Sequence, residues 1–112
     1  MIDFHSHILP HFDDGAKDAA TGLEMLRMSA DSGTDTVVST SHFYPEQYSN
    51  ASDFIHKRGM AFAELTDAAE SENFKLPRIV LGAEVYLGKK LSRVKNLHTL
   101  CIGDTDYMML EM

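Results

Sequence analysis

Thr36-Val37-Val38-Ser39-Thr40 is a short segment rich in β-branched residues, and it predicts a buried strand. Similar apolar segments occur at 1–4, 78–82 and 107–110. The stretches between the first three carry apolar residues at helical spacing. Strands that alternate with helices indicate βαβ units, so we expect an α/β fold with a parallel sheet.

Two helices are expected between these strands. The first should begin at Thr21, because Thr21-Gly22-Leu23-Glu24 has the form of a capping box, and should end at Gly33. The second should begin with Ser52 as its cap. Its apolar positions recur at helical spacing at Ile55, Phe62, Leu65 and Ala69, and Phe54, Ala61 and Ala68 lie beside this stripe. One or two further helical turns are expected between Leu87 and Leu97.

Composition excludes several classes of protein. The chain has 112 residues, with 10 Lys+Arg against 17 Asp+Glu and a formal net charge of −7. An acidic chain of this kind is not expected to bind nucleic acid, and without a run of 18 apolar residues it is not expected to insert into a membrane. The single cysteine, Cys101, excludes an internal disulfide framework and indicates a cytoplasmic protein. The length suits one domain but is about half of what a β/α barrel needs.

Potential metal ligands follow each apolar segment. His5 and His7 follow the first, His42 the second, Glu84 the third and Glu111 the fourth. The carboxyl ends of parallel strands meet at one face of an α/β fold, so these side chains should converge there. His5 and His7 are two residues apart, and on an extended backbone they would point the same way.

The loop after the first strand offers further candidates. In Asp13-Asp14-Gly15 the glycine allows a sharp turn that could aim a carboxylate back at the strand end, while one of the two aspartates is expected to form an ordinary Asx turn. His11 and Asp13 would support a ligand or face the substrate.

Each candidate also has a plainer interpretation. His5 and His7 could be solvated polar residues at a strand end, and His42 could be a hydrogen-bonded core histidine. Glu84 could form a salt bridge with Arg78 or Lys89. Glu111 could lie in a frayed end. Histidine and carboxylate ligands without thiolates suit Mn²⁺, Fe²⁺ or Zn²⁺, and clustered ions of this kind suit the hydrolysis of phosphate esters.

Taken together, the motifs resemble one family. They are His5-Ser6-His7-Ile8-Leu9-Pro10, Asp13-Asp14-Gly15, Ser39-Thr40-Ser41-His42, Gly82-Ala83-Glu84-Val85-Tyr86 and Leu110-Glu111. Their order resembles the PHP (polymerase and histidinol phosphatase) superfamily, and within it the bacterial manganese-dependent protein-tyrosine phosphatases of capsule and exopolysaccharide biosynthesis.

The resemblance implies a distorted, TIM-like β/α barrel with a trinuclear metal site. His5 and His7 would bind one ion, Glu84 would bridge two, Glu111 would bind the second, and Asp14 and His42 would bind the third. A metal-bridging hydroxide would attack phosphorus, so no cysteine nucleophile is needed. The substrate would be a phosphotyrosine protein, a bacterial tyrosine kinase of polysaccharide export.

The family's pattern continues with a further histidine ligand, an Asp-x-His pair and phosphate-binding arginines, and this sequence ends at Met112 before them. Residues 1–112 are therefore expected to form a partial PHP domain, the N-terminal half of the barrel, with little metal and little or no activity alone. Two other functions remain open. One is hydrolysis of a small phosphate ester such as histidinol phosphate, and the other is a non-catalytic fragment that only associates with a partner chain. An open barrel edge could also pair two copies into a homo-oligomer.

Overall fold

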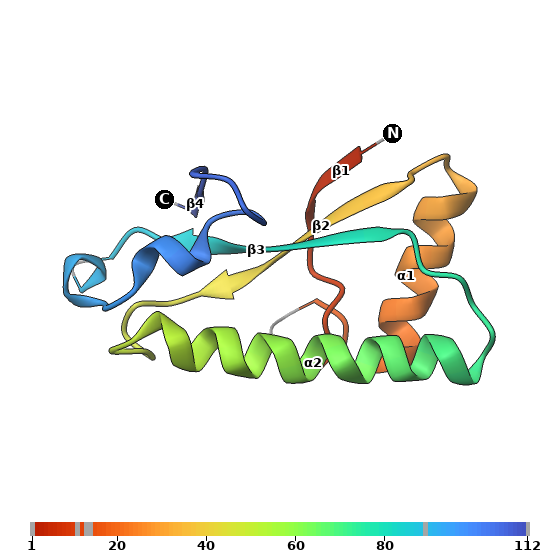
Figure 1. Cartoon of the computed structure of the whole chain (residues 1–112), viewed down its shortest axis with the longest axis horizontal. Helices are drawn as coiled ribbons and strands as arrows, with labels where there is room; N and C mark the ends of the chain where they lie inside the picture. The colour runs from red at the N-terminus through yellow and green to blue at the C-terminus, as the bar shows by residue number, and fades with distance from the viewer. Residues whose placement is uncertain (1, 11, 13–14, 89, 112) are drawn as a thin grey trace.

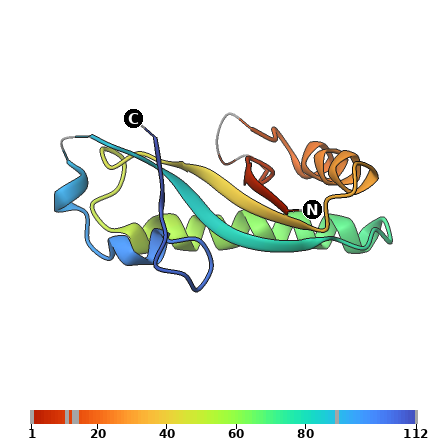
Figure 2. The ribbon, with the colours of Figure 1, turned by 90° about the horizontal axis from the view of Figure 1, so that it is seen from above.

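The computed structural model describes residues 2–10, 12, 15–88 and 90–111. Within this part of the chain, four parallel strands form one sheet in the order of the sequence (Figure 1). They are β1 (Ile2–Ser6), β2 (Thr36–Phe43), β3 (Arg78–Tyr86) and β4 (Met109–Glu111). This order confirms the predicted α/β class with parallel strands. Each strand lies beside the previous one and the sheet is curled, as in half of a β/α barrel (Figure 2).

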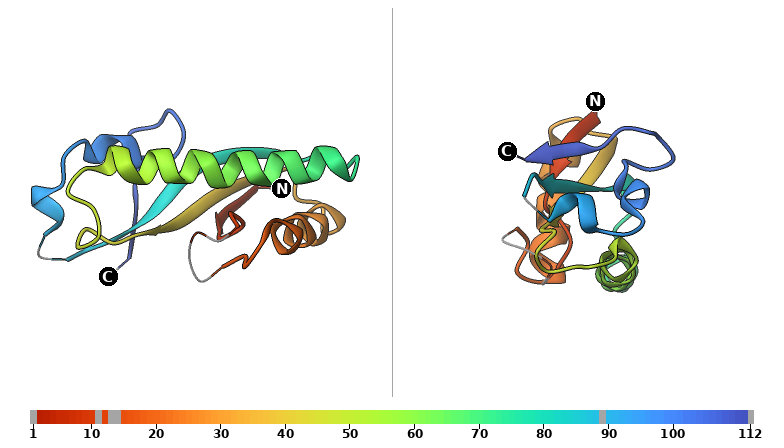
Figure 3. Two further views of the ribbon diagram at one scale, coloured as in Figure 1. Left: turned by 90° about the horizontal axis from the view of Figure 1, so that it is seen from below. Right: turned by 90° about the vertical axis from the view of Figure 1, so that its left-hand side faces the viewer.

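Two helices cover one face of the sheet and pack against each other (Figure 3). They are α1 (Ala19–Asp31) and α2 (Ala51–Ser71). Leu23 and Leu26 of α1 meet Leu65 of α2 in a buried cluster that also includes Val37 of β2. The opposite face of the sheet is therefore left to the side chains that alternate with Val37 along β2.

The buried stripe of α2 differs in part from the prediction. Leu65 and Ala69 are buried as expected, but Ile55 and Phe62 are only half-buried. The buried apolar positions earlier in the helix are Ala51, Phe54 and Ala61. Of these, Phe54 and Ala61 lie one residue before Ile55 and Phe62, at positions predicted to lie beside the stripe. Neither helix in the described residues has the length and apolar character needed to cross a membrane.

Both predicted helix starts were wrong by about one turn or less. Asp18 caps α1, and its carboxylate accepts a hydrogen bond from the Thr21 backbone N–H at 2.8 Å. Asn50 caps α2 in the same way, accepting from the Ser52 N–H at 2.9 Å. Asp18 and Asn50 have the extended backbone that a capping residue requires, whereas Thr21 and Ser52 lie inside the first turns.

The predicted end of α1 is confirmed. Gly33 follows Ser32, the C-cap of α1, and has a φ of 91°. The Thr34 N–H donates to the Ser29 carbonyl at 2.9 Å. This is the left-handed ending that favours glycine. One short 3₁₀ helix, Leu91–Arg93, lies in the range where further helical turns were expected. A second, Leu97–Leu100, begins at the last residue of that range and extends beyond it.

β2 and β3 extend three to four residues beyond their predicted ends at positions 40 and 82. They stay paired through His42 opposite Glu84 and Phe43 opposite Val85. Phe43 and Val85 are fully buried, and this burial stabilises the extension of both strands beyond the predicted ends. His42 and Glu84 therefore lie within strands and not in the loops that follow them. β4 begins two residues later than predicted, since Tyr107 lies in the preceding turn, where its carbonyl accepts from the Ile102 N–H at 2.8 Å.

Candidate metal centre

A register shift in β1 decides which face of the sheet its histidines occupy. Asp3 lies opposite Val37, but Ser6 lies opposite Ser39, so β1 contains one residue more than β2 between these two pairs. Val37 and Ser39 are on the helix-covered face. The bulge therefore moves His5 to the opposite face, which it shares with His42.

Polar contacts of Ser6 hold this register in place. The Ser6 hydroxyl donates to the Val38 carbonyl at 2.8 Å. The Thr40 hydroxyl accepts from the Ser6 N–H at 3.1 Å and donates to the Ser6 carbonyl at 3.2 Å. Three hydrogen bonds thus join β1 and β2 immediately beside the two histidines.

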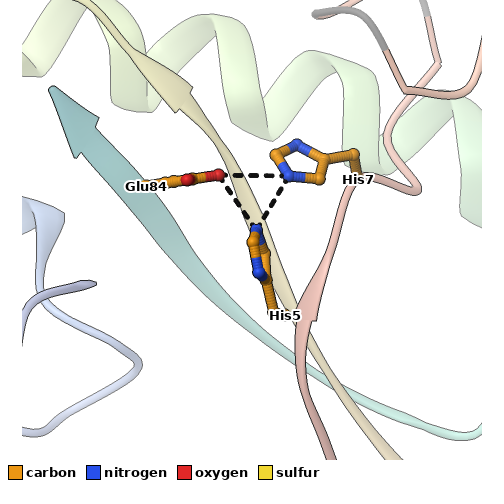
Figure 4. A group of neighbouring side chains, drawn as sticks. All are labelled: His5, His7 and Glu84. Carbon is orange, nitrogen blue, oxygen red and sulfur yellow. Dashed lines mark hydrogen bonds and ion pairs between the residues drawn. The ribbon is translucent and has the colours of Figure 1, made fainter. Parts of the chain in front are cut away.

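His5, His7 and Glu84 point toward one another from β1, the residues after it and β3 (Figure 4). His5 Nε2 lies 2.9 Å from Glu84 Oε1 and 3.1 Å from His7 Nε2. His7 Nε2 lies 3.2 Å from the same Glu84 oxygen. Three possible ligand atoms therefore form a nearly equilateral triangle.

The size of this triangle fits a transition-metal ion. Two ligand atoms at about 2.1 Å from one ion lie roughly 3.0 Å apart at a right angle and roughly 3.4 Å apart at a tetrahedral angle. The three observed separations, 2.9 to 3.2 Å, fall in or next to this range. Two imidazoles and one carboxylate form a donor set suited to Mn²⁺, Fe²⁺ or Zn²⁺.

A second group of possible ligands adjoins the first. His42 Nδ1 lies 3.6 Å from Glu84 Oε1 and 3.5 Å from Glu111 Oε2. The ligand atoms of His42, Glu84 and Glu111 all lie within 4.8 Å of one another. Glu84 belongs to both groups, so its carboxylate is placed to bridge two ions.

The histidines also determine the charge of Glu84. Its burial would raise the pKa, but the hydrogen bond with His5 and the nearby charges of His5, His42 and His7 lower it more. The pKa of Glu84 therefore lies below its ordinary value, and the group is a carboxylate near neutral pH. The alternative salt bridge with Arg78 is not favoured, because Arg78 begins β3 and Glu84 lies near its other end. Lys89 is outside the described residues.

Three of the predicted site residues, His11, Asp13 and Asp14, lie outside the described residues, so their roles stay predictions. The chain after them does return toward the site. The Ala16 N–H donates to the His7 carbonyl at 2.9 Å, and a Cβ built on Gly15 would lie 2.2 Å from that carbonyl oxygen. Gly15 therefore allows a close approach of the backbone to His7, whereas the predicted turn that aims an aspartate at the strand end stays a prediction. The third ion, assigned to Asp14 and His42, also stays a prediction.

Sequence reasoning gave no role to two tyrosines that border these groups. The rings of His7 and His42 stack with centroids 4.5 Å apart, and the ring of Tyr44 stacks on His42 at 5.5 Å. Tyr86 lies 5.9 Å beyond Tyr44. Each tyrosine is two residues after a proposed ligand. Because residues two apart on a strand share a face, this spacing could have predicted that the tyrosines lie beside the ligands.

Comparison with known proteins identifies the family of the chain. The family model for capsular polysaccharide synthesis, CpsB/CapC, matches residues 1–112. The tyrosine-protein phosphatase YwqE of Bacillus subtilis is 31% identical over 112 residues, which are 99% of this chain and 42% of YwqE. The tyrosine-protein phosphatase CpsB of Streptococcus agalactiae is 30% identical, over 99% of this chain and 44% of CpsB.

A solved structure shows the same likeness. It is one of the crystal structures of YwqE from Bacillus subtilis and CpsB from Streptococcus pneumoniae, which are metal-dependent tyrosine phosphatases. The TM-score is 0.70 at 27% identity, covering 98% of this chain and 43% of that one. The chain thus spans less than half the length of the relatives that it matches. Since the family model covers every residue, the chain belongs to the CpsB/CapC family of capsular polysaccharide synthesis proteins.

Proposed function

We propose that the protein containing this chain is a metal-dependent phosphomonoester hydrolase that acts on phosphotyrosine in proteins. The observation that carries the proposal is Glu84, whose carboxylate belongs to two groups of possible ligands. Neighbouring ions that share a carboxylate are typical of enzymes that hydrolyse phosphate esters. The names of the relatives, which are tyrosine-protein phosphatases, support the choice of substrate.

The residues of this chain have separable tasks in that reaction. His5 and His7 would hold one ion and Glu111 the other, with Glu84 common to both. His42, which the resemblance assigns to a third ion with Asp14, also lies within reach of the second. Divalent cations bound there would lower the pKa of water and offset the negative charge of the phosphoryl group. Because Glu84 remains anionic near neutral pH, it is available as a ligand without first losing a proton.

We propose Mn²⁺ as the ion, with Fe²⁺ and Zn²⁺ as alternatives that the same donors accept. A tyrosine kinase of polysaccharide export is the proposed protein substrate, and the bacterial cytoplasm the proposed compartment. Pairing through the exposed edge of β4 into a homo-oligomer is a further proposal.

Metal titration combined with a phosphatase assay tests the function. Mn²⁺ is added to the purified chain, and free Mn²⁺ is followed by electron paramagnetic resonance. Hydrolysis of a phosphotyrosyl peptide is measured beside a phosphoseryl peptide and histidinol phosphate. Because the chain alone is expected to hold little metal, we expect weak but saturable Mn²⁺ binding and at most slow turnover of the phosphotyrosyl peptide, both lost in Glu84→Gln. Glu70→Gln, which changes an exposed carboxylate on α2, is the matched control and should behave like the parent chain.

Other outcomes would point elsewhere. Faster turnover of histidinol phosphate would favour the small-ester alternative. A folded chain that binds no Mn²⁺ and forms oligomers would favour the non-catalytic fragment. Equal Mn²⁺ binding by Glu84→Gln and the parent chain would refute the role of the shared carboxylate.

A further inference from the structure

A row of neighbouring rings, stacked from His7 to Tyr44 and tilted between Tyr44 and Tyr86, leads from the candidate ligands to the molecular surface. It runs from His7 through His42 and Tyr44 to Tyr86, with successive centroids 4.5, 5.5 and 5.9 Å apart. All three separations lie within the range of favourable aromatic contacts. Tyr86 is 38% exposed, so the row ends in a ring that solvent can reach.

The position of the Tyr86 ring is fixed by its surroundings. A Cβ built on Gly88 would lie 3.3 Å from Cδ2 and Cε2 of Tyr86, so the ring rests against the backbone of the next turn. Tyr86 is also the partner of Glu111 in the β3–β4 register, and the Leu87 N–H donates to the Glu111 carbonyl at 2.9 Å. The ring is therefore carried by the same strand pair as the second ligand group.

We propose that Tyr86, supported by Tyr44, is a specificity surface for the aromatic ring of the substrate's leaving group. This inference rests on the proposed function and names the residues that recognise the ester. In an aryl phosphate a single oxygen joins the ring to phosphorus. A phosphoryl group at the Glu84–Glu111 ligands therefore holds the ring close to the strand ends that carry Tyr44 and Tyr86.

Stacking on Tyr86 discriminates between classes of ester. A phenyl group offers a flat apolar face to an offset or edge-on partner ring, and such ring pairs are worth more than their buried area alone. The alkyl chain of a phosphoserine has no such face. The surface therefore favours aryl over alkyl phosphates without any contact to the phosphoryl oxygens.

If Tyr86 had only a structural role in packing, its replacement would have a different effect. Replacement by leucine would then change stability or metal affinity but would affect aryl and alkyl ligands equally. The ratio of their affinities is a readout that a purely structural role leaves unchanged, and Tyr86→Phe preserves the ring as a conservative control.

The test compares two ligands on the Mn²⁺-loaded chain. Phenylphosphonate and methylphosphonate share the same acidic group and differ in the ring, and their binding is followed by the relaxation that Mn²⁺ imposes on their ³¹P signals. We expect phenylphosphonate to bind the parent chain about threefold to tenfold more tightly, as expected for one aromatic pair. Tyr86→Leu should remove this preference and leave methylphosphonate affinity unchanged, whereas Tyr86→Phe should keep it. Tyr107→Leu replaces a tyrosine that is 77% exposed before β4, and it should also keep the preference.

The outcomes distinguish this inference from the proposed function. If methylphosphonate binds and the parent chain shows no preference for phenylphosphonate, the inference is refuted and the proposed function is not. The same holds if Tyr86→Leu retains the preference. If neither phosphonate binds the Mn²⁺-loaded parent chain, these ligands do not hold a phosphoryl group in this chain and the inference fails, whereas the proposed function is judged by the phosphatase assay described above.

Discussion

Replacing Gly15 by alanine should displace His7 and weaken the first ligand group. A Cβ at this position would lie 2.2 Å from the His7 carbonyl oxygen and 2.3 Å from its Cβ. Side-chain Cβ atoms essentially never come closer than 3.0 Å to such an atom, and ordinary contact begins at 3.4 Å, so the Cβ and the oxygen must separate by about 0.8 to 1.2 Å. Neither atom is at the end of a flexible side chain. The movement must therefore be taken up by the backbone that carries His7 or by the loop.

The effect on metal binding follows from the size of that shift. His7 Nε2 lies 3.1 Å from His5 Nε2 and 3.2 Å from Glu84 Oε1. A movement of about 1 Å takes it out of the coordination distance of an ion held by the other two. We expect Mn²⁺ affinity to fall by about 10- to 100-fold, a range typical of lost ligand orientation.

Electron paramagnetic resonance titration with Mn²⁺ measures this loss, and thermal unfolding reports stability. Gly59→Ala is the matched control, because it makes the same chemical change at a position in α2 where a Cβ meets nothing within 4 Å. Both variants alter the unfolded chain equally. Mn²⁺ affinity within about twofold of the parent chain in Gly15→Ala would refute the reasoning, since the loop would then absorb the clash without moving His7.

The remaining predictions concern the shared ligand and the two helices. Glu84→Gln should weaken binding of both ions, whereas Glu111→Gln should weaken only one, and a two-site fit of Mn²⁺ titrations separates these results. Gly22→Ala should destabilise the fold by about 1–2 kcal/mol, because its Cβ would lie 2.5 Å from the Ile8 carbonyl oxygen and the cost of overpacking exceeds the gain in helix propensity. Gly59→Ala should instead stabilise it by about 0.5–1 kcal/mol, and urea unfolding gives both values. Asp18→Ala should cost about 1 kcal/mol through loss of the α1 cap, and an unchanged urea midpoint would contradict that role.

Local sequence patterns were sufficient to predict the α/β class of the fold. β-Branched runs such as Thr36–Thr40 and the apolar spacing of α2 predicted a strand and a helix where the structure has them. The expected meeting of His5, His7, His42, Glu84 and Glu111 followed from one topological rule, that parallel strands present their carboxyl ends at one face. That rule does not depend on exactly where each strand ends. The predicted meeting of these side chains was therefore correct although the predicted strand ends were not.

Element boundaries depended on information that the local sequence does not contain. Thr21 and Asp18 both have side chains that can cap a helix, and only the backbone leading into α1 selects Asp18. β2 continues past Thr40 because Phe43 finds a buried site beside Val85 and Phe54, residues distant in sequence. The row of rings was also missed, because Tyr44 and Tyr86 meet only when β2 and β3 pair in the observed register.

The face of the sheet on which His5 lies could not be predicted from the residue types alone. His5 and His7 share a face in any extended strand, but the choice of face depends on the pairing of β1 with β2. Without the extra residue between Asp3 and Ser6, position 5 would lie opposite Ser39, which is fully buried on the helix side of the sheet. The imidazoles would then point away from Glu84. Ser6 therefore contributes to the metal centre without offering a ligand, because its hydrogen bonds with Val38 and Thr40 hold the register that turns His5 toward Glu84.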